Sequence, residues 1–354
     1  MRSPLADYKP SLSVRQIVTP KEAAELTRAV RKCIFADDSA GAIRLINAGA
    51  NIMAQSALGE MESLLVMTCA WKLNPVSLHL IEHGADINAV NSDGASPLLK
   101  CCERGNVLIA CLLIERGANI EVETVNGTPL IRSCGQGSEI IALTLLDKGA
   151  NFKAVAKKTL DTPLILSCSN GMQRVSLRLM DLGADVNAVN NSGDTPLLNC
   201  CKQDDEMTAL HLIEKGANPS AAEPKTGLTP LMIACTHGND VVAEKLLRAG
   251  ADVNAKAVNG STPLLLSCKA GNNHDIALYL IDAAHADIHA VDNFGYTALL
   301  WCCINGMEDI ALRLITLGAD VNVKETHHGL TPLAAIGTRS PTVWSALLSR
   351  GAKE

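Results

Sequence analysis

Apolar and polar positions follow one order that recurs along most of the chain. From Ser63 onward, each unit begins with Ser or Thr, usually followed by Pro. Leu stands third, an apolar residue fourth, a variable residue fifth, a small residue sixth and usually Cys seventh. Ser or Thr before Pro is typical of a helix N-terminus. Because the leucine and the cysteine are four residues apart, they share one face of the predicted helix.

The second half of each unit predicts another helix and then a loop. A glycine stands three residues after most of the cysteines, and we expect it to end the first helix in the left-handed conformation: Gly105, Gly137, Gly171, Gly238, Gly271 and Gly306. An apolar segment such as 310–315 follows and stops at another glycine, Gly318. The residues before the next threonine are rich in Asn, Asp and Gly, as at 290–296, which predicts a hairpin-like loop.

The cysteines of the seventh position recur every 32 to 35 residues, at Cys69, Cys102, Cys134, Cys168, Cys201, Cys235, Cys268 and Cys303. A fixed period in this range indicates stacked supersecondary units rather than a closed globule. A chain of 354 residues would otherwise suggest two or three domains. The period instead predicts one array that grows by addition.

These motifs resemble those of the ankyrin-repeat family. The resemblance rests on Gly-Ala-Asp-Val-Asn-Ala at 183–188 and 250–255, with variants at 84–89 and 318–322, and on Thr-Pro-Leu beginning at 128, 162, 195, 229, 262 and 331. It implies an all-α repeat solenoid of about ten helix-turn-helix units, joined by β-hairpin-like finger loops. We expect a flexible N-terminal lead-in at 1–19 and one repeat domain at 20–354, with an N-terminal capping repeat (20–52), internal repeats (53–325) and a C-terminal capping repeat (326–354).

The chain departs from the family pattern in several places. The histidine usual after Thr-Pro-Leu is replaced by an apolar residue, such as Leu99 or Met232, so its hydrogen bonds between loops are missing and apolar burial is expected to substitute. Around 272–288 the repeat is two residues longer, and His285 stands where a helix-ending glycine is expected. We expect a bend or fraying at that junction.

Composition excludes several functional classes. The net charge of −6 argues against a nucleic-acid binder. No run of 18 apolar residues exists to span a membrane, and no secretory signal precedes the first unit. Equivalent cysteines of stacked units would lie about 10 Å apart, too far for disulfides, which indicates buried thiols in the cytosol or nucleus.

No enzyme, cofactor or metal motif is present. The chain has no phosphate loop, no His-Glu-x-x-His and no Cys-x-x-Cys. The vicinal cysteines, such as Cys101 and Cys102, have the wrong spacing for a structural metal site, and His327-His328 has no third ligand nearby in the sequence. We therefore expect neither catalysis nor a metal site.

Function must then lie in surface positions that vary while the pattern stays constant. The family resemblance implies a concave surface made of the finger loops and the two residues after the small pair of the first helix. These positions hold Trp71, Glu103, Arg104, Lys158, Lys202, Lys225, His237, Lys269, Phe294, Tyr296, His327 and Arg339. Aromatic residues and Arg are favoured at interface hot spots. The alternative is that the aromatic residues of the loops only pack on the next finger, and that Trp301 packs locally.

The leading hypothesis is a monomeric, non-catalytic adaptor, scaffold or inhibitor that binds an unidentified protein on the concave face. One alternative is a host-directed effector of an intracellular microbe. Another, implied by the resemblance, is a substrate of asparagine hydroxylation at Asn88, Asn187, Asn254 and Asn322.

Overall fold

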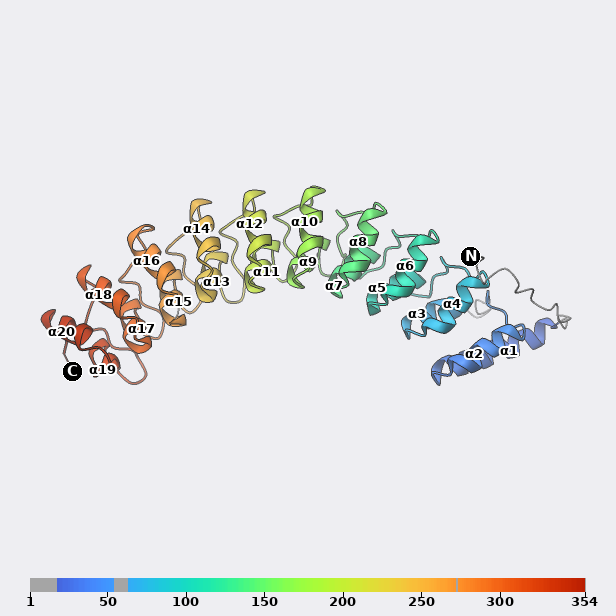
Figure 1. Ribbon diagram of the computed structural model, residues 1–354, viewed down its shortest axis with the longest axis horizontal. Helices are drawn as coiled ribbons and strands as arrows, with labels where there is room; N and C mark the ends of the chain where they lie inside the picture. Colours follow the sequence, from blue (N-terminus) through green and yellow to red (C-terminus); the bar gives the residue numbers. More distant parts are fainter. Residues whose placement is uncertain (1–17, 54–62, 272, 354) are drawn as a thin grey trace, which may run out of the picture. The chain divides into compact units, whose positions relative to one another are not determined.

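The computed structural model describes residues 18–53, 63–271 and 273–353. The described residues form twenty α-helices in successive pairs, which confirms the predicted all-α repeat architecture (Figure 1). The predicted lead-in at 1–19 lies almost entirely outside them. The chain divides into two compact units, the first ending at Thr124 and the second beginning at Val125.

The first unit holds three helix pairs. The long α1 has a capping box, in which Thr19 and Glu22 each accept a backbone N–H of the other residue. The helices are α1 (Pro20–Phe35), α2 (Ser39–Asn47), α3 (Leu64–Ala70), α4 (Asn74–Glu82), α5 (Pro97–Arg104) and α6 (Val107–Glu115).

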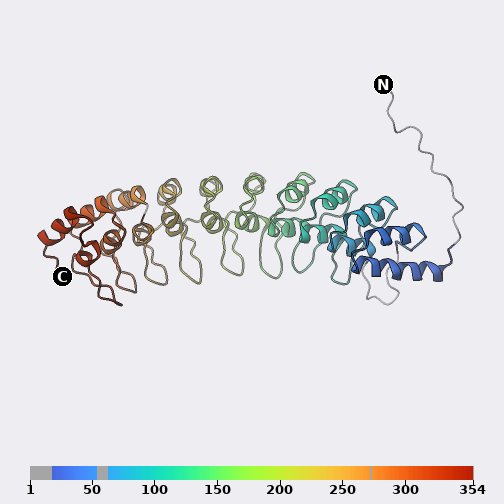
Figure 2. The same cartoon turned by 60° about the horizontal axis from the view of Figure 1, so that its bottom comes forward.

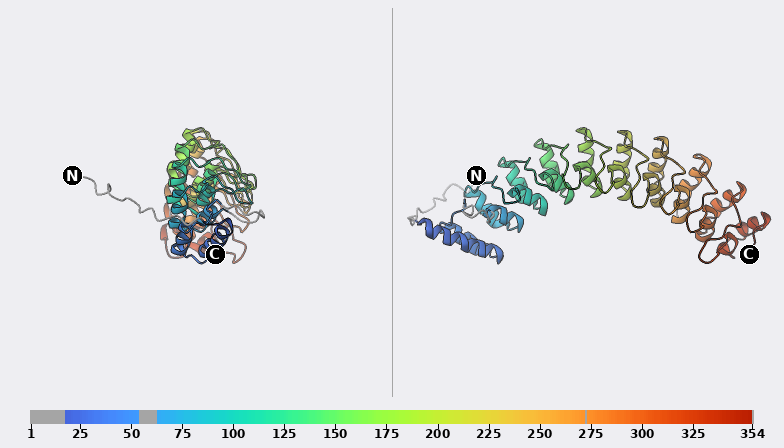
Figure 3. Two further views of the ribbon diagram at one scale, coloured as in Figure 1. Left: turned by 90° about the vertical axis from the view of Figure 1, so that its right-hand side faces the viewer. Right: turned by 180° about the vertical axis from the view of Figure 1, so that it is seen from behind.

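The second unit holds seven helix pairs. They are α7 (Pro129–Gly135) with α8 (Glu139–Asp147), α9 (Pro163–Ser169) with α10 (Gln173–Asp181), α11 (Pro196–Lys202) with α12 (Glu206–Glu214), α13 (Pro230–His237) with α14 (Asp240–Arg248), α15 (Pro263–Ala270) with α16 (His274–Asp282), α17 (Ala298–Asn305) with α18 (Glu308–Thr316), and α19 (Pro332–Ile336) with α20 (Pro341–Ser349). Each first helix packs on its own second helix and on the first helix of the next pair. Figure 3 shows this succession of pairs from behind.

The predicted helix starts and turns are confirmed. In α15, for example, the hydroxyl of Thr262 accepts the backbone N–H of Leu265 at 3.3 Å. Gly271 then ends the helix with φ +81°, a conformation that side chains disfavour. The cysteines of the seventh position are buried against neighbouring helices, and Cys268 has no exposed surface.

The apolar residues that replace the usual histidine are buried in most units, as expected. Leu99 and Met232 have no exposed surface, whereas Ala334 in the last pair is exposed. Hydrogen bonds between loops are nevertheless present. Backbone groups of neighbouring fingers supply them, as from Val258 N–H to Thr226 carbonyl at 2.8 Å and from Thr326 N–H to Phe294 carbonyl at 2.9 Å.

The long repeat accommodates its two additional residues in separate turns. Asn273, the residue before α16, stands two positions after Gly271, whereas Asn239, the residue before α14, stands one position after Gly238. After α16, the left-handed position is delayed by one residue and is taken by His285, with φ +56°. The Ala286 N–H closes this turn on the Leu280 carbonyl at 2.8 Å, so α16 keeps the nine residues of its neighbours.

Finger loops of the second unit project from the side of the first helices (Figure 2). In some of these loops, one side-chain oxygen of an Asp or Asn accepts two backbone N–H groups of the same loop. Asp292 accepts the N–H groups of Phe294 and Tyr296, both at 2.9 Å, and Asn190 does the same in an earlier loop. These local bonds fix the loop residues beside the helices.

Candidate functional site

The first helices and finger loops of the second unit form one continuous surface, which we call the finger-side face. It is defined by the fifth and eighth positions of each first helix, counted from the capping Ser or Thr, together with the loop residues. Lys202 and Lys269 both occupy the eighth position, in α11 and α15. The two lysines differ completely in their surroundings.

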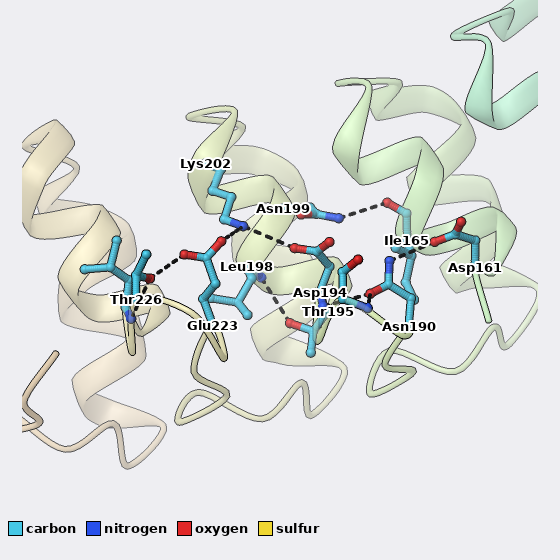
Figure 4. Close-up of polar contacts among 12 residues, drawn as sticks. Asp161, Ile165, Asn190, Asp194, Thr195, Leu198, Asn199, Lys202, Glu223 and Thr226 are labelled. Atoms are coloured by element: carbon cyan, nitrogen blue, oxygen red, sulfur yellow. Dashed lines mark hydrogen bonds and ion pairs between the residues drawn. The ribbon is translucent and has the colours of Figure 1, made fainter. Parts of the chain in front are cut away.

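Lys202 forms ion pairs with carboxylates of two successive finger loops (Figure 4). Its ammonium lies 3.1 Å from Asp194 and 2.7 Å from Glu223. Although burial opposes its charge, hydrogen bonds to the two carboxylates raise the pKa of Lys202. The pKa of Glu223 is lowered mainly by its hydrogen bond from Lys202 and, to a smaller extent, by its hydrogen bond from Thr226. This predicted binding residue is therefore neutralised by the protein itself.

Lys269 is exposed and lies against an aromatic ring instead. Its ammonium is 5.4 Å from the centre of the Trp301 ring, within the range of cation–π attraction. Among the described residues, no carboxylate lies within ion-pair distance of Lys269. Trp301, in the fifth position of α17, is half-buried. The positive charge of Lys269 thus stays available at the surface.

Aromatic side chains extend from Trp301 along the finger loop that precedes α17. The Tyr296 ring stacks on Trp301 with a centroid distance of 4.3 Å and an interplanar angle of 16°. Phe294, from the same loop, stacks on His327 of the next loop with a centroid distance of 5.9 Å. Phe294 keeps 44% of its surface exposed. We call Lys269, Phe294, Tyr296, Trp301 and His327 the aromatic cluster.

The loop that carries His327 is held by a buried carboxylate. Glu325 is 2% exposed and accepts backbone N–H groups of His327, His328 and Leu330 at 2.7, 2.5 and 3.2 Å. Burial acts to raise the pKa of Glu325, but the three donors outweigh it and lower the pKa. Glu325 is therefore used inside the loop and does not face the cluster as a surface charge.

A separate hollow lies on the finger-side face at α7 and α9. This cavity of about 250 Å³ has apolar walls that include Ile131 and Leu166, and Arg132 and Asp161 are among its polar lining residues. Gly135 takes the eighth position here, so no side chain fills the space. The cavity is smaller than a usual small-molecule site.

Side chains in the ninth position of the first helices contact the preceding repeat. Trp71 contacts Phe35 edge to face with a centroid distance of 6.1 Å, and a nitrogen of His237 lies 4.0 Å from Asp204. Asn305 donates to the Cys268 carbonyl at 2.8 Å, and Arg339 donates to the Ile304 carbonyl at the same distance. Trp71 is still 58% exposed.

The structure therefore brings together four of the predicted binding residues, Lys269, Phe294, Tyr296 and His327. It places Trp301, for which local packing was expected, between Lys269 and Tyr296. The other predicted binding residues lie outside this cluster. Glu103 bonds Lys100 at 3.2 Å, whereas Arg104, Lys158 and Lys225 are exposed. A signal for Trp301 was present, because polar residues take its position in three other units.

The described residues hold free thiols but no grouping of metal ligands. All thirteen cysteines are thiols rather than disulfides, and burial raises the pKa of Cys201 and Cys303 to about 12. Such thiols are poor nucleophiles. In the part of the chain that the structure describes, no three His, Cys, Asp or Glu residues are placed to hold a metal ion. None of its helices is long and apolar enough to cross a membrane.

The four asparagines considered for hydroxylation each bond the backbone of the following repeat. The side-chain oxygen of Asn187 accepts the Asn218 N–H at 2.7 Å, and its amide donates to the Gly216 carbonyl at 3.1 Å. Asn88, Asn254 and Asn322 accept backbone N–H groups of the next repeat in the same way. These residues hold neighbouring repeats together.

Comparison with known proteins agrees with the geometry. Residues 64–156, 164–257 and 231–325 match the family described as ankyrin repeats in three copies. A segment of 93 residues is 37% identical to an ankyrin repeat protein of Acanthamoeba polyphaga mimivirus. The segment is 26% of this chain and only 9% of that relative, so the likeness concerns the repeats and not the whole viral protein.

Proposed function

The chain belongs to the ankyrin-repeat family, and from that premise we propose that it is a non-catalytic binding protein that holds a protein partner on its finger-side face. Repeats of this family generally act as protein–protein interaction modules and are generally non-catalytic. The observation that carries the proposal is the aromatic cluster. It combines exposed Phe294 and half-buried Trp301 with an unneutralised lysine that lies over the Trp301 ring, a combination typical of interface hot spots.

The chain has few aromatic residues, which strengthens the argument. Only 3% of its residues are Phe, Trp or Tyr, yet three of them gather around one finger loop and one helix. Packing alone would be served by the aliphatic residues that other units use, such as Ile233 and Leu266 in the position of Trp301. Aromatic rings offer large contact areas at a small cost in side-chain entropy.

The test compares two double variants of the full chain. Phe294→Ala with Trp301→Ala removes the cluster, whereas Ile140→Ala with Met207→Ala removes two exposed apolar side chains from the second helices α8 and α12. Each protein is used to capture partners from extracts of its native cell, with quantitative mass spectrometry and with thermal unfolding as a check on the fold. We expect specific partners to be lost only by the first variant.

Equal retention of all partners by the two variants would show that the finger-side cluster is not the binding surface. If only the Ile140→Ala, Met207→Ala variant lost its partners, the interface would lie on the second helices instead. A scaffold, an adaptor, an inhibitor and a host-directed effector all use such a surface, and the identity of the captured proteins distinguishes them.

A further inference from the structure

Resting on this proposed function, we infer that the aromatic cluster binds an acidic segment of a partner, in which an Asp or Glu side chain stands next to a large apolar side chain. The inference concerns the chemistry of the partner, which the family relationship does not specify. It is carried by the distribution of charges between equivalent positions of the second unit.

The first step is the contrast between Lys202 and Lys269. In the loop after α11, Glu223 reaches Lys202, and Asp194 before α11 completes the pairing. Ser261 stands before α15 at the place of Asp194. In the loop that follows, Asp292 takes the place of Glu223, but one of its oxygens accepts two backbone N–H groups of its own loop. Lys269 therefore lacks the carboxylates that its counterpart has.

The second step concerns the remaining charges around the cluster. The carboxylate of Glu325 is buried and accepts three backbone N–H groups, so its oxygens are not exposed beside the cluster, although its negative charge remains. Lys324 and His328 are exposed in the same loop. The guanidinium of Arg339 is held on the carbonyls of Ile304 and Ala335 and brings a further positive charge to α17 and α19. Three cations, Lys269, Lys324 and Arg339, thus lie in or next to the cluster and outnumber the carboxylates of Asp292 and Glu325, in a chain whose net charge is −6.

The third step is the apolar surface beside these cations. Phe294 is 44% exposed, and half-buried Leu266 and Ile304 lie in the first helices that carry Lys269 and Trp301. A carboxylate that approaches Lys269 would therefore bring its neighbouring side chain against apolar groups. Opposite charges across such a surface give specificity and speed association, while the apolar contact supplies affinity.

A single-stranded nucleic acid is the competing ligand class, because bases stack on aromatic rings and phosphates pair with lysines. Two observations favour the acidic peptide: the chain has a net negative charge, and Lys269 is the one lysine that the described residues place over a ring of the cluster. Binding of an oligonucleotide is accordingly an outcome of the test rather than part of the inference.

The experiment selects ligands without assuming a sequence. A displayed library of random linear peptides is panned on the full chain at physiological salt, and enriched peptides are synthesised with a fluorescent label. Their affinities are measured for the natural protein and for Trp301→Ala, Lys269→Glu and Lys225→Glu. The last variant makes the same change of charge at an exposed finger lysine outside the cluster. Labelled oligothymidylate is titrated in parallel.

We expect the enriched peptides to combine Asp or Glu with an adjacent Phe, Trp, Leu or Ile. Lys269→Glu should weaken them about tenfold or more, and Lys225→Glu by less than about twofold, because surface charges beyond the Debye length are screened.

Peptides that depend on Trp301 but carry no acidic excess, or that are unaffected by Lys269→Glu, would overturn the inference and leave the proposed function standing. Absence of any peptide that depends on Trp301 would count against both. Oligothymidylate that binds tighter than every peptide and depends on Trp301 would replace the acidic peptide by a nucleic acid.

Discussion

The ammonium of Lys269 lies over the ring of Trp301, 5.4 Å from its centre, whereas the equivalent Lys202 is enclosed by Asp194 and Glu223. Two lysines that occupy the same position of the repeat thus serve different purposes. One stabilises the contact between neighbouring fingers, and the other remains charged at the surface. This difference leads to specific expectations for stability, reactivity and pH dependence.

The stack of Tyr296 on Trp301 should contribute measurable stability. In a double-mutant cycle of Tyr296→Ala and Trp301→Ala, we expect a coupling of about 1 kcal/mol, the range found for aromatic pairs. Urea unfolding of the four proteins measures it. Tyr296→Ala combined with Trp344→Ala, a tryptophan of α20 with no ring contact in the described part, should be additive within error. Additivity in both cycles would refute the stabilising stack.

Replacing Lys202 should destabilise the second unit more than replacing Lys269. Lys202→Met leaves two carboxylates without their partner and should cost on the order of 1 kcal/mol at pH 7, against a few tenths for Lys269→Met. Because the pKa of Glu223 is lowered in the folded state, its contribution is complete above the unfolded pKa near 4.5 and is lost as the pH falls through the folded value. The difference between the two variants should shrink over that window.

Urea titrations of the two variants at several pH values between 7 and 3 measure this difference. A gap that stays constant across the series would mean that the carboxylates of Asp194 and Glu223 are not responsible for it.

The cysteines should divide sharply by reactivity. Cys33 and Cys111 are half-buried, and the remaining eleven are buried. Burial raises the pKa of Cys201 and Cys303 to about 12, so the reactive thiolate is scarce at neutral pH. We expect N-ethylmaleimide to modify only Cys33 and Cys111 in the folded protein and all thirteen in denaturant, as read by peptide mass spectrometry. Labelling of Cys268 at the rate of Cys111 would contradict the burial of the cysteines in the seventh position.

His285 holds a backbone conformation that glycine adopts in the other units. Its φ is +56°, a conformation that costs most side chains about 1 kcal/mol relative to glycine. His285→Gly should therefore stabilise the protein by up to roughly that amount in urea unfolding. The matched change, Gly318→His, should destabilise it by a similar amount, since Gly318 has φ +90° and open space around its Cα. A destabilising His285→Gly would indicate that the imidazole makes a compensating contact.

Much of the fold could be predicted from the sequence, because its signals act over a few residues. The hydroxyl of Thr262 meets an N–H three residues away, and Gly271 reverses the chain within one turn. The spacing of Cys268 from Leu264 likewise determines which helix face is buried. The candidate site was less accessible to such reasoning. Lys202, His237 and Arg339 were predicted to face a partner, and the sequence did not reveal that each also contacts a neighbouring segment of the chain.

The sequence by itself determined the repeat, the helix boundaries and the buried cysteine positions, since these follow from hydrogen bonds and periodicity within one unit. Only the tertiary structure decided which of two equivalent lysines would be neutralised, and that Trp301 would gather Lys269 and Tyr296 around it. Those contacts join side chains of different helices and finger loops, and Lys269 and Trp301 are about thirty residues apart in the chain. Their formation depends on side-chain length and on the register in which the units stack, and neither is encoded in the pattern of a single repeat.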